Sequence, residues 1–189
     1  MHERRFNPVH MHRLDSPERR KMLPPDTLLQ QLPIQETDSV VDLGAGTGYF
    51  TIPAAQRTQG KVFAVDVEPQ MLEVIKGKVE ESGTENVELV QGAIEDVPLE
   101  DETANHVIAS LVLHEVEPLH RGLSEIRRLL KDGGHCLCLE WEKTPSEMGP
   151  PLHHRIHSND MKKAFEDAGF TVTKHEAPTP MHYLLVARK

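Results

Sequence analysis

Short apolar runs and longer amphipathic stretches alternate along the chain. The short runs, rich in Val, Ile and Leu, predict buried strands at 40–43, 62–66, 87–90, 106–110 and 135–141. Between them, apolar residues at helical spacing predict helices at 49–57, 69–82, 118–130 and 158–168. Strands that alternate with helices are typical of βαβ units, so we expect a doubly wound α/β fold.

The two ends of the chain depart from this alternation. Residues 170–174 and 181–187 predict a terminal hairpin, with its turn at 178–180. Residues 1–24 are rich in Arg and His, and we expect a mobile segment there, with a short helix that begins at Ser16. A second short helix is predicted up to Pro33. Residues 25–189 are then expected to form a single domain.

Composition narrows the class of protein. The chain has 189 residues, enough for one complete core, and 38% of them are apolar. The net charge of −9 argues against a surface that follows nucleic-acid phosphates. No stretch is long enough to span a membrane and no apolar leader is present, so we expect neither membrane insertion nor secretion. Cys136 and Cys138 are interpreted as buried thiols of a cytoplasmic protein.

Gly44, Gly46 and Gly48 stand between a predicted strand and a predicted helix. This arrangement forms a cradle for a nucleotide, because glycine lets the backbone approach a ligand and the helix N-terminus offers unpaired N–H groups. A dinucleotide fingerprint would require Gly where Thr51 stands. Asp42, just before the turn, would repel a pyrophosphate but suits an amine. A nicotinamide-dependent oxidoreductase is therefore disfavoured, yet stays an alternative.

The segment D-L-G-A-G-T-G at 42–48 resembles the first motif of the class I S-adenosylmethionine-dependent methyltransferases. Further segments resemble the same family in the expected order, at 62–66, 92–99, 106–113 and 129–134. The resemblance covers residues 25–189 and is greatest to the group related to ubiquinone/menaquinone C-methyltransferases. It implies a Rossmann-like sheet of seven strands in the order 3-2-1-4-5-7-6, with strand seven antiparallel and helices on both faces.

The resemblance also implies a set of cofactor-binding residues. Asp42 and the glycine backbone would hold the methionine end of S-adenosylmethionine, Asp66 would accept hydrogen bonds from the ribose, and Met71 would pack on the adenine. The backbone at Ala93 and Ile94 would read the adenine edge. The full set is Asp42, Gly44, Ala45, Gly46, Gly48, Asp66, Val67, Met71, Ala93, Ile94 and Ser110.

Two side chains are candidates for work on the methyl acceptor. His114 follows the fourth predicted strand and, when neutral, can take a proton from the acceptor. Arg155, in a long irregular segment, can hold an anionic group by bidentate hydrogen bonds. We expect a small-molecule acceptor, because the D/N-P-P-Y/F pattern of amino-directed methyltransferases is absent after Ser110. Residues 1–24 would then form a lid over the site.

Other possibilities remain open at this stage. His153, His154 and His157 have no Cys or carboxylate companions at metal-binding spacing, so we expect no metal site. The chain is expected to be a monomer or a homodimer that binds no nucleic acid. A protein that binds S-adenosylmethionine without transferring its methyl group stays an alternative, because binding residues can persist without turnover.

Overall fold

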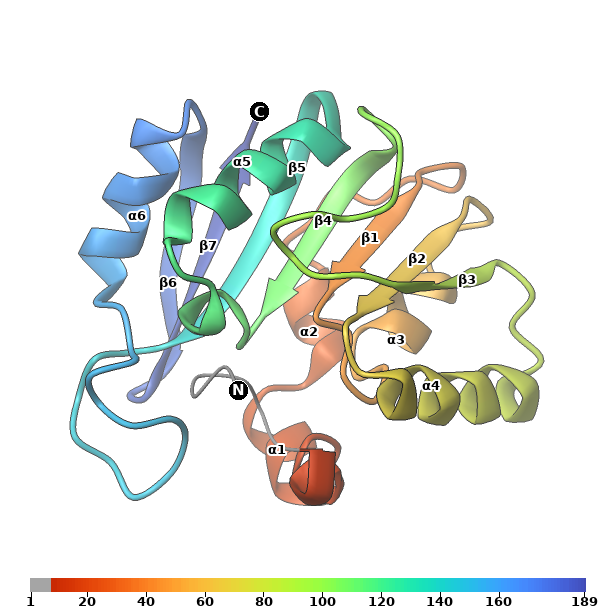
Figure 1. Ribbon diagram of the computed structural model, residues 1–189, viewed down its shortest axis with the longest axis horizontal. Helices are drawn as coiled ribbons and strands as arrows, with labels where there is room; N and C mark the ends of the chain where they lie inside the picture. Colours follow the sequence, from red (N-terminus) through yellow and green to blue (C-terminus); the bar gives the residue numbers. More distant parts are fainter. Residues whose placement is uncertain (1–7) are drawn as a thin grey trace.

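The computed structural model describes residues 8–189, and its centre is one sheet of seven strands in the order β3-β2-β1-β4-β5-β7-β6 (Figure 1). The strands are β1 Val40–Leu43, β2 Val62–Asp66, β3 Val87–Gln91, β4 Ala104–Ser110, β5 Leu130–Trp141, β6 Thr171–Thr179 and β7 His182–Arg188. Strands β1 to β5 pair in parallel, and β7 is antiparallel to both of its neighbours. The predicted order and the antiparallel seventh strand are confirmed.

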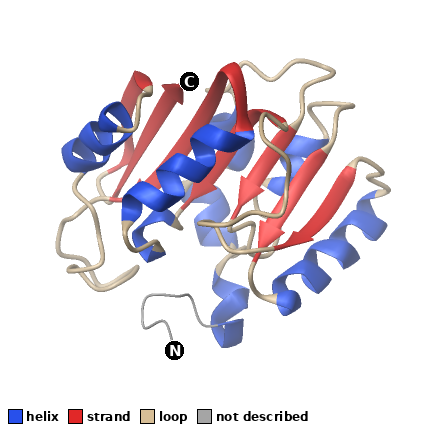
Figure 2. Ribbon diagram, turned by 45° about the horizontal axis from the view of Figure 1, so that its top comes forward, coloured by secondary structure: helices blue, strands red, loops and turns tan. Residues whose placement is uncertain are grey.

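Helices cover both faces of this sheet (Figure 2). The helical segments are η1 Pro8–Arg13, α1 Pro17–Met22, α2 Pro25–Leu29, α3 Thr51–Ala55, α4 Pro69–Ser82, η2 Leu113–Glu115, α5 Leu119–Leu129 and α6 Ser158–Asp167. Side chains of α5 and α6 pack on one face, while those of α2, α3 and α4 pack on the other. The alternation of β-strand side chains produces this division, since Val41 of β1 faces α5 and Val40 faces α2 and α3.

Several element boundaries differ from those predicted. Strand β5 begins at Leu130, because Leu130 already pairs with Ala104, and β4 begins correspondingly earlier. The β4–β5 register shifts between the pairs Ala104–Leu130 and His106–His135. Gly133, with φ 77°, accommodates this irregularity, so β5 continues through it. Strand β6 continues to Thr179, so the hairpin turn lies at 180–181 and not at 178–180.

The topology brings the carboxyl ends of the parallel strands to one edge of the molecule. Chain order reverses between β1 and β4, which are neighbours in the sheet, and ligands of doubly wound folds bind at such a point. Figure 1 shows α1 below the arrowheads of these strands, with the loop between β5 and α6 beside it. Within residues 8–189, no helix is long and apolar enough to cross a membrane.

Candidate functional site

A cavity of about 930 Å³ lies at the carboxyl ends of β1, β2, β4 and β5. Its wall includes the loop after β1, the loop after β3, the segment after β4, the β5–α6 loop and the N-terminal helices. The predicted site residues in this wall are Asp42, Gly44, Ala45, Gly46, Asp66, Val67, Met71, Ala93, Ile94, Ser110 and His114. Gly48 and Arg155 are the predicted residues that the wall does not contain.

The glycine-rich loop is shaped by positive φ angles and by close neighbours. Gly44 has φ +64°, and a Cβ on it would lie 2.4 Å from Cγ2 of Val112. Any other residue type would strain the backbone at this φ and would push against the Val112 side chain. Gly48 has φ +80° but faces Ile75 of α4, so its predicted contact with the cofactor is not supported. Gly48 instead allows the turn that leads into α3.

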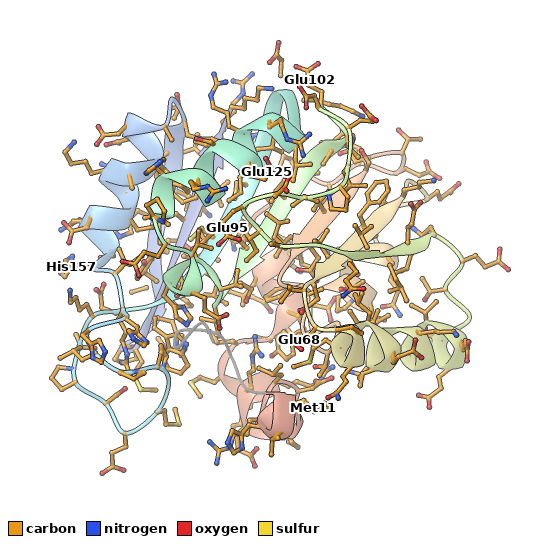
Figure 3. The ribbon with its side chains drawn as sticks, in the orientation of Figure 1. Met11, Glu68, Glu95, Glu102, Glu125 and His157 are labelled. Carbon is orange, nitrogen blue, oxygen red and sulfur yellow. The ribbon has the colours of Figure 1, made fainter. Side chains whose placement is uncertain are left out.

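Asp66, the last residue of β2, fixes this loop from the neighbouring strand. Its Oδ2 accepts a hydrogen bond from the Gly46 N–H at 2.8 Å, and its Oδ1 accepts one from the Glu68 N–H at 2.9 Å. Burial raises the pKa of Asp66, although these two N–H groups oppose the rise. Asp66 therefore joins the glycine loop to the start of α4, where Glu68 is labelled in Figure 3.

Asp42 is a carboxylate with very little access to solvent, 2% exposed. The Thr51 hydroxyl donates to its Oδ2 at 2.7 Å. Burial raises the pKa of Asp42 to about 7, and the nearby charge of Asp66 adds to the rise. A cationic group of a ligand in the cavity would favour the ionised form, because it would supply the charge that burial leaves uncompensated.

Arg19 is a wall residue that the sequence interpretation missed. Its Nη1 donates to the Leu14 carbonyl at 2.6 Å, and its guanidinium lies 4.1 Å from the centroid of the Tyr49 ring. Its Nε is buried and has no hydrogen-bond partner among residues 8–189. The usable signal was the Ser16 cap, which is confirmed by the Arg19 N–H bond to Ser16 Oγ at 3.2 Å and places Arg19 one turn into α1.

The loop after β3 is held in place by α5. Glu125 Oε1 accepts from the Val97 N–H at 2.8 Å, and Arg128 donates to the carbonyls of Val97 and Leu99 at 3.0 and 2.7 Å. These bonds keep Ala93 and Ile94 at the cavity. Figure 3 labels Glu125 on α5 and Glu95 in the loop itself. The periodicity of α5 identified its apolar face but gave no sign that Glu125 is turned inward.

His114 lines the cavity and is hydrogen-bonded to Glu140, a residue of β5. Its Nδ1 lies 2.9 Å from Glu140 Oε2 and 3.1 Å from Oε1, and its backbone N–H donates to Oε1 at 3.2 Å. Both side chains are buried, 5% and 1% exposed. Burial lowers the pKa of His114, but the Glu140 carboxylate outweighs burial and the net shift is upward. The same pairing lowers the pKa of Glu140 against the opposing effect of its burial.

Arg155 has a different role from the one predicted. Its guanidinium donates to the carbonyls of Pro150 and Thr144 and to the Ser146 hydroxyl at 2.8, 2.9 and 2.9 Å, and it also bonds the Met148 carbonyl. The residue is 3% exposed. The predicted anchor for an anionic substrate is therefore not supported, because these oxygens already occupy the guanidinium. Arg155 shapes the loop that closes one side of the cavity.

The histidines of that loop contact one another and the start of α6. The rings of His153 and His154 meet edge to face with centroids 4.2 Å apart. His157 caps α6, since its Nδ1 accepts from the Asn159 N–H at 3.2 Å, so the cap is one residue earlier than predicted. Across residues 8–189, no three His, Cys, Asp or Glu side chains gather closely enough to hold a metal ion.

The segment that contains the glycine loop matches a known protein family. The sequence pattern of a family described as a methyltransferase domain matches residues 41–138, more than half of the chain. The chain belongs to this methyltransferase family. The match contains the glycine loop, Asp66, the loop after β3 and His114. The nicotinamide-dependent alternative, which the glycine spacing left open, is set aside.

Relatives and solved structures extend the comparison. The chain is 36% identical over 109 residues to a demethylmenaquinone methyltransferase of Bacillus cereus, covering 57% of this chain and 46% of that protein. It is 32% identical over 144 residues to the ubiquinone/menaquinone biosynthesis C-methyltransferase UbiE of Francisella tularensis, covering 75% and 56%. The chain thus spans about half the length of these curated relatives.

A solved structure agrees with the chain over nearly its whole length. A SAM-dependent methyltransferase from Aquifex aeolicus superposes with a TM-score of 0.90 at 26% identity, covering 97% of this chain and 99% of that one. The cyclase SpnF shares the fold at 18% identity with a TM-score of 0.78. Because one fold carries different reactions, the activity has to be argued from the side chains of the site.

Proposed function

We propose that this protein transfers a methyl group from S-adenosylmethionine to a small-molecule acceptor. The observation that carries the proposal is His114, which is hydrogen-bonded to the buried Glu140 and lines one cavity with the glycine loop and Asp42. One part of the cavity thus offers the groups that would bind S-adenosylmethionine. Another part offers a base for a second molecule.

The residues of the wall fit the cofactor. Asp42 would hold the ammonium group, and the unpartnered Nε of Arg19 would hold the carboxylate. Asp66 would accept from the ribose hydroxyls beside the close-packed turn at Gly44. Met71 would pack on the adenine. S-adenosylmethionine would supply a methyl group that its sulfonium sulfur activates, so the main task of the protein is to place the acceptor in line with that methyl group.

His114 would act on the acceptor. Glu140 occupies Nδ1, which leaves Nε2 as the ring nitrogen that can take a proton. A carboxylate that fixes the tautomer and raises the pKa of the imidazole makes it a stronger base. Glu140 is thus proposed as a positioning residue, and His114 as the residue that touches the acceptor.

The N-terminal helices would form the lid predicted for residues 1–24, of which residues 1–7 lie outside the described part. Leu14 approaches the glycine loop, since a Cβ on Gly46 would lie 3.2 Å from its Cδ1. Tyr49 donates from its hydroxyl to the Leu23 carbonyl at 2.8 Å, and Lys78 bonds both Asp15 and the Thr47 carbonyl. These contacts support an N-terminal segment that closes on the bound cofactor.

Calorimetric titration with S-adenosylmethionine, S-adenosylhomocysteine and NAD tests the first half of the proposal. We expect binding of the first two and none of NAD. The second half needs acceptor-dependent formation of S-adenosylhomocysteine, tested with a panel of small hydroxylated and amino compounds. Binding without turnover on any acceptor would favour the non-catalytic alternative, and absence of binding would refute the proposal.

A further inference from the structure

Gly122 lies in the first half of α5, where the helical backbone itself does not require glycine. Glycine weakens a helix relative to alanine, because its backbone loses more freedom on folding. The neighbours of Gly122 do favour it, since a Cβ there would lie 3.1 Å from Cγ1 of Val116 and 3.6 Å from Cγ2 of Ile94. Carbon atoms in favourable contact lie about 3.5–4.0 Å apart, so a methyl group on Gly122 would displace Val116.

The two side chains that meet at Gly122 come from two different parts of the cavity wall. Ile94 lies in the loop after β3, whose backbone would read the adenine edge, and Val116 directly follows η2, which carries His114. Both pack in one hydrophobic cluster with side chains of α5. Gly122 itself is not among the described residues that form the wall. It therefore lies behind the wall, where the cofactor side and the acceptor side share one support.

The loop after β3 is fixed by hydrogen bonds on either side of Ile94. Before it, the Gly92 N–H donates to the Asp66 carbonyl at 3.1 Å. After it, the N–H and the carbonyl of Val97 bond two side chains of α5 at 2.8 and 3.0 Å. Between these points, Ile94 is placed by packing against the Gly122 surface of α5.

The segment that carries His114 rests on the same surface. The Val116 N–H donates to the Leu113 carbonyl at 3.2 Å, which closes the short turn that contains His114. Val116 is buried, so its side chain has no solvent into which it could move freely. Packed interiors transmit strain, and a displaced Val116 would therefore disturb the turn at His114 as well as its neighbour Ile94.

We propose that Gly122 is a positioning residue for the methyl transfer, because its missing side chain lets the loop after β3 and the His114 turn sit together on α5. This inference rests on the proposed function and names a residue that touches neither ligand. A methyl group at this point would shift the backbone that faces the adenine edge and would loosen the pairing of His114 with Glu140. Asp42 and Asp66, on β1 and β2, would keep their places.

Gly122→Ala tests the inference, and the preference between two nucleosides is its first readout. S-adenosylhomocysteine and S-inosylhomocysteine differ at the edge of the base, where the second has an oxygen in place of the amino group. Both are titrated calorimetrically into the full chain. We expect Gly122→Ala to weaken S-adenosylhomocysteine roughly tenfold, the effect of about one hydrogen bond, and to leave S-inosylhomocysteine nearly unchanged. A general loosening of the fold would weaken both alike.

Gly77→Ala is the matched control, because Gly77 lies inside α4 and a Cβ there would meet no other segment of residues 8–189 within 4 Å. It should raise the midpoint of thermal unfolding, since alanine favours the helix, and leave the nucleoside preference as it is. Val116→Ala removes the atoms on which a Cβ at Gly122 would press. Added to Gly122→Ala, it should restore the preference, and it should also restore folding if Gly122→Ala alone does not fold.

The His114 turn provides the second readout, an NMR titration that needs no acceptor. Gly122→Ala should lower the pKa of His114, because the Glu140 carboxylate that raises it is held less closely, and Gly77→Ala should not. An unchanged preference or an unchanged titration in folded Gly122→Ala, or a double variant that does not regain the preference, would overturn the inference. Failure of the unaltered protein to bind S-adenosylhomocysteine would refute the proposed function instead.

Discussion

Asp42 is a residue whose burial prepares it for a cation. Its pKa of about 7 means that it is only partly ionised at neutral pH, and Thr51 supplies its hydrogen bond. The ionised form is the one that attracts an ammonium group. Cofactor binding should therefore be linked to loss of a proton from Asp42, and affinity should rise as the pH passes through 7.

We expect the affinity for S-adenosylmethionine to be roughly tenfold lower at pH 6 than at pH 8, because about one Asp42 in eleven is ionised at pH 6 when its pKa is 7. Asp42→Asn should lower the affinity at pH 8 and abolish this dependence. Calorimetry at the two pH values measures both effects. Asp132, an exposed carboxylate near the amino-terminal end of β5 and so away from the cavity, provides the matched control Asp132→Asn. A pH dependence retained in Asp42→Asn would assign it to another group.

Glu140 acts through His114, to which it is hydrogen-bonded. Its carboxylate outweighs the burial that would lower the pKa of His114, so Glu140→Gln should lower that pKa. The neutral imidazole would then persist to lower pH, so the acid limb of the pH profile of turnover should shift to lower pH. The maximal turnover rate should fall, because the imidazole is a weaker base. NMR titration of His114 measures the shift without an acceptor. Glu142→Gln, on the same segment, should leave the His114 titration where it is.

At the scale of elements, the sequence predicted the frame of the site better than its lining. Short Val-rich runs and the Pro69 helix start defined β1, β2 and α4 almost to the residue, because apolar period and caps are local signals. Glu125 was missed, since its inward orientation depends on a partner distant in sequence, the Val97 N–H. The loop contacts of Arg155 were not foreseen for a different reason: its partners are close in sequence, but they lie in an irregular loop whose path no periodicity predicts.

The β5–α6 loop yields the prediction that belongs to an element. Arg155→Lys would lose most of the fork of hydrogen bonds to Thr144, Ser146 and Pro150. We expect a loss of about 1–3 kcal/mol in unfolding free energy and faster hydrogen exchange at 144–150, with affinity for S-adenosylmethionine unchanged. Arg121→Lys, on the exposed side of α5, is the control. Weaker binding of anionic compounds with an unchanged loop would restore the anchor that the sequence suggested.

At the scale of the whole molecule, helix α2 is packed into the core, whereas α1 lies on the outside of the frame that the sheet forms. Helix α1 buries none of its own residues, and it is joined to the frame through Tyr49 and through the pair of Lys78 and Asp15. Segments with few buried apolar contacts open most readily. A ligand beneath them that contacts Arg19 would therefore hold them closed.

We accordingly expect S-adenosylhomocysteine to slow hydrogen exchange across residues 14–23 and to leave the β4 core unchanged. Lys78→Met removes the bonds to Asp15 and to the Thr47 carbonyl, so it should speed exchange of this segment in the free protein. Because closing then starts from a more open state, the variant should bind the cofactor more weakly and show a larger protection on binding. Lys76→Met, on the same helix but outside these contacts, is the control. Equal exchange across 14–23 with and without ligand would show that the N-terminal helices are a fixed cap on the sheet and not a lid.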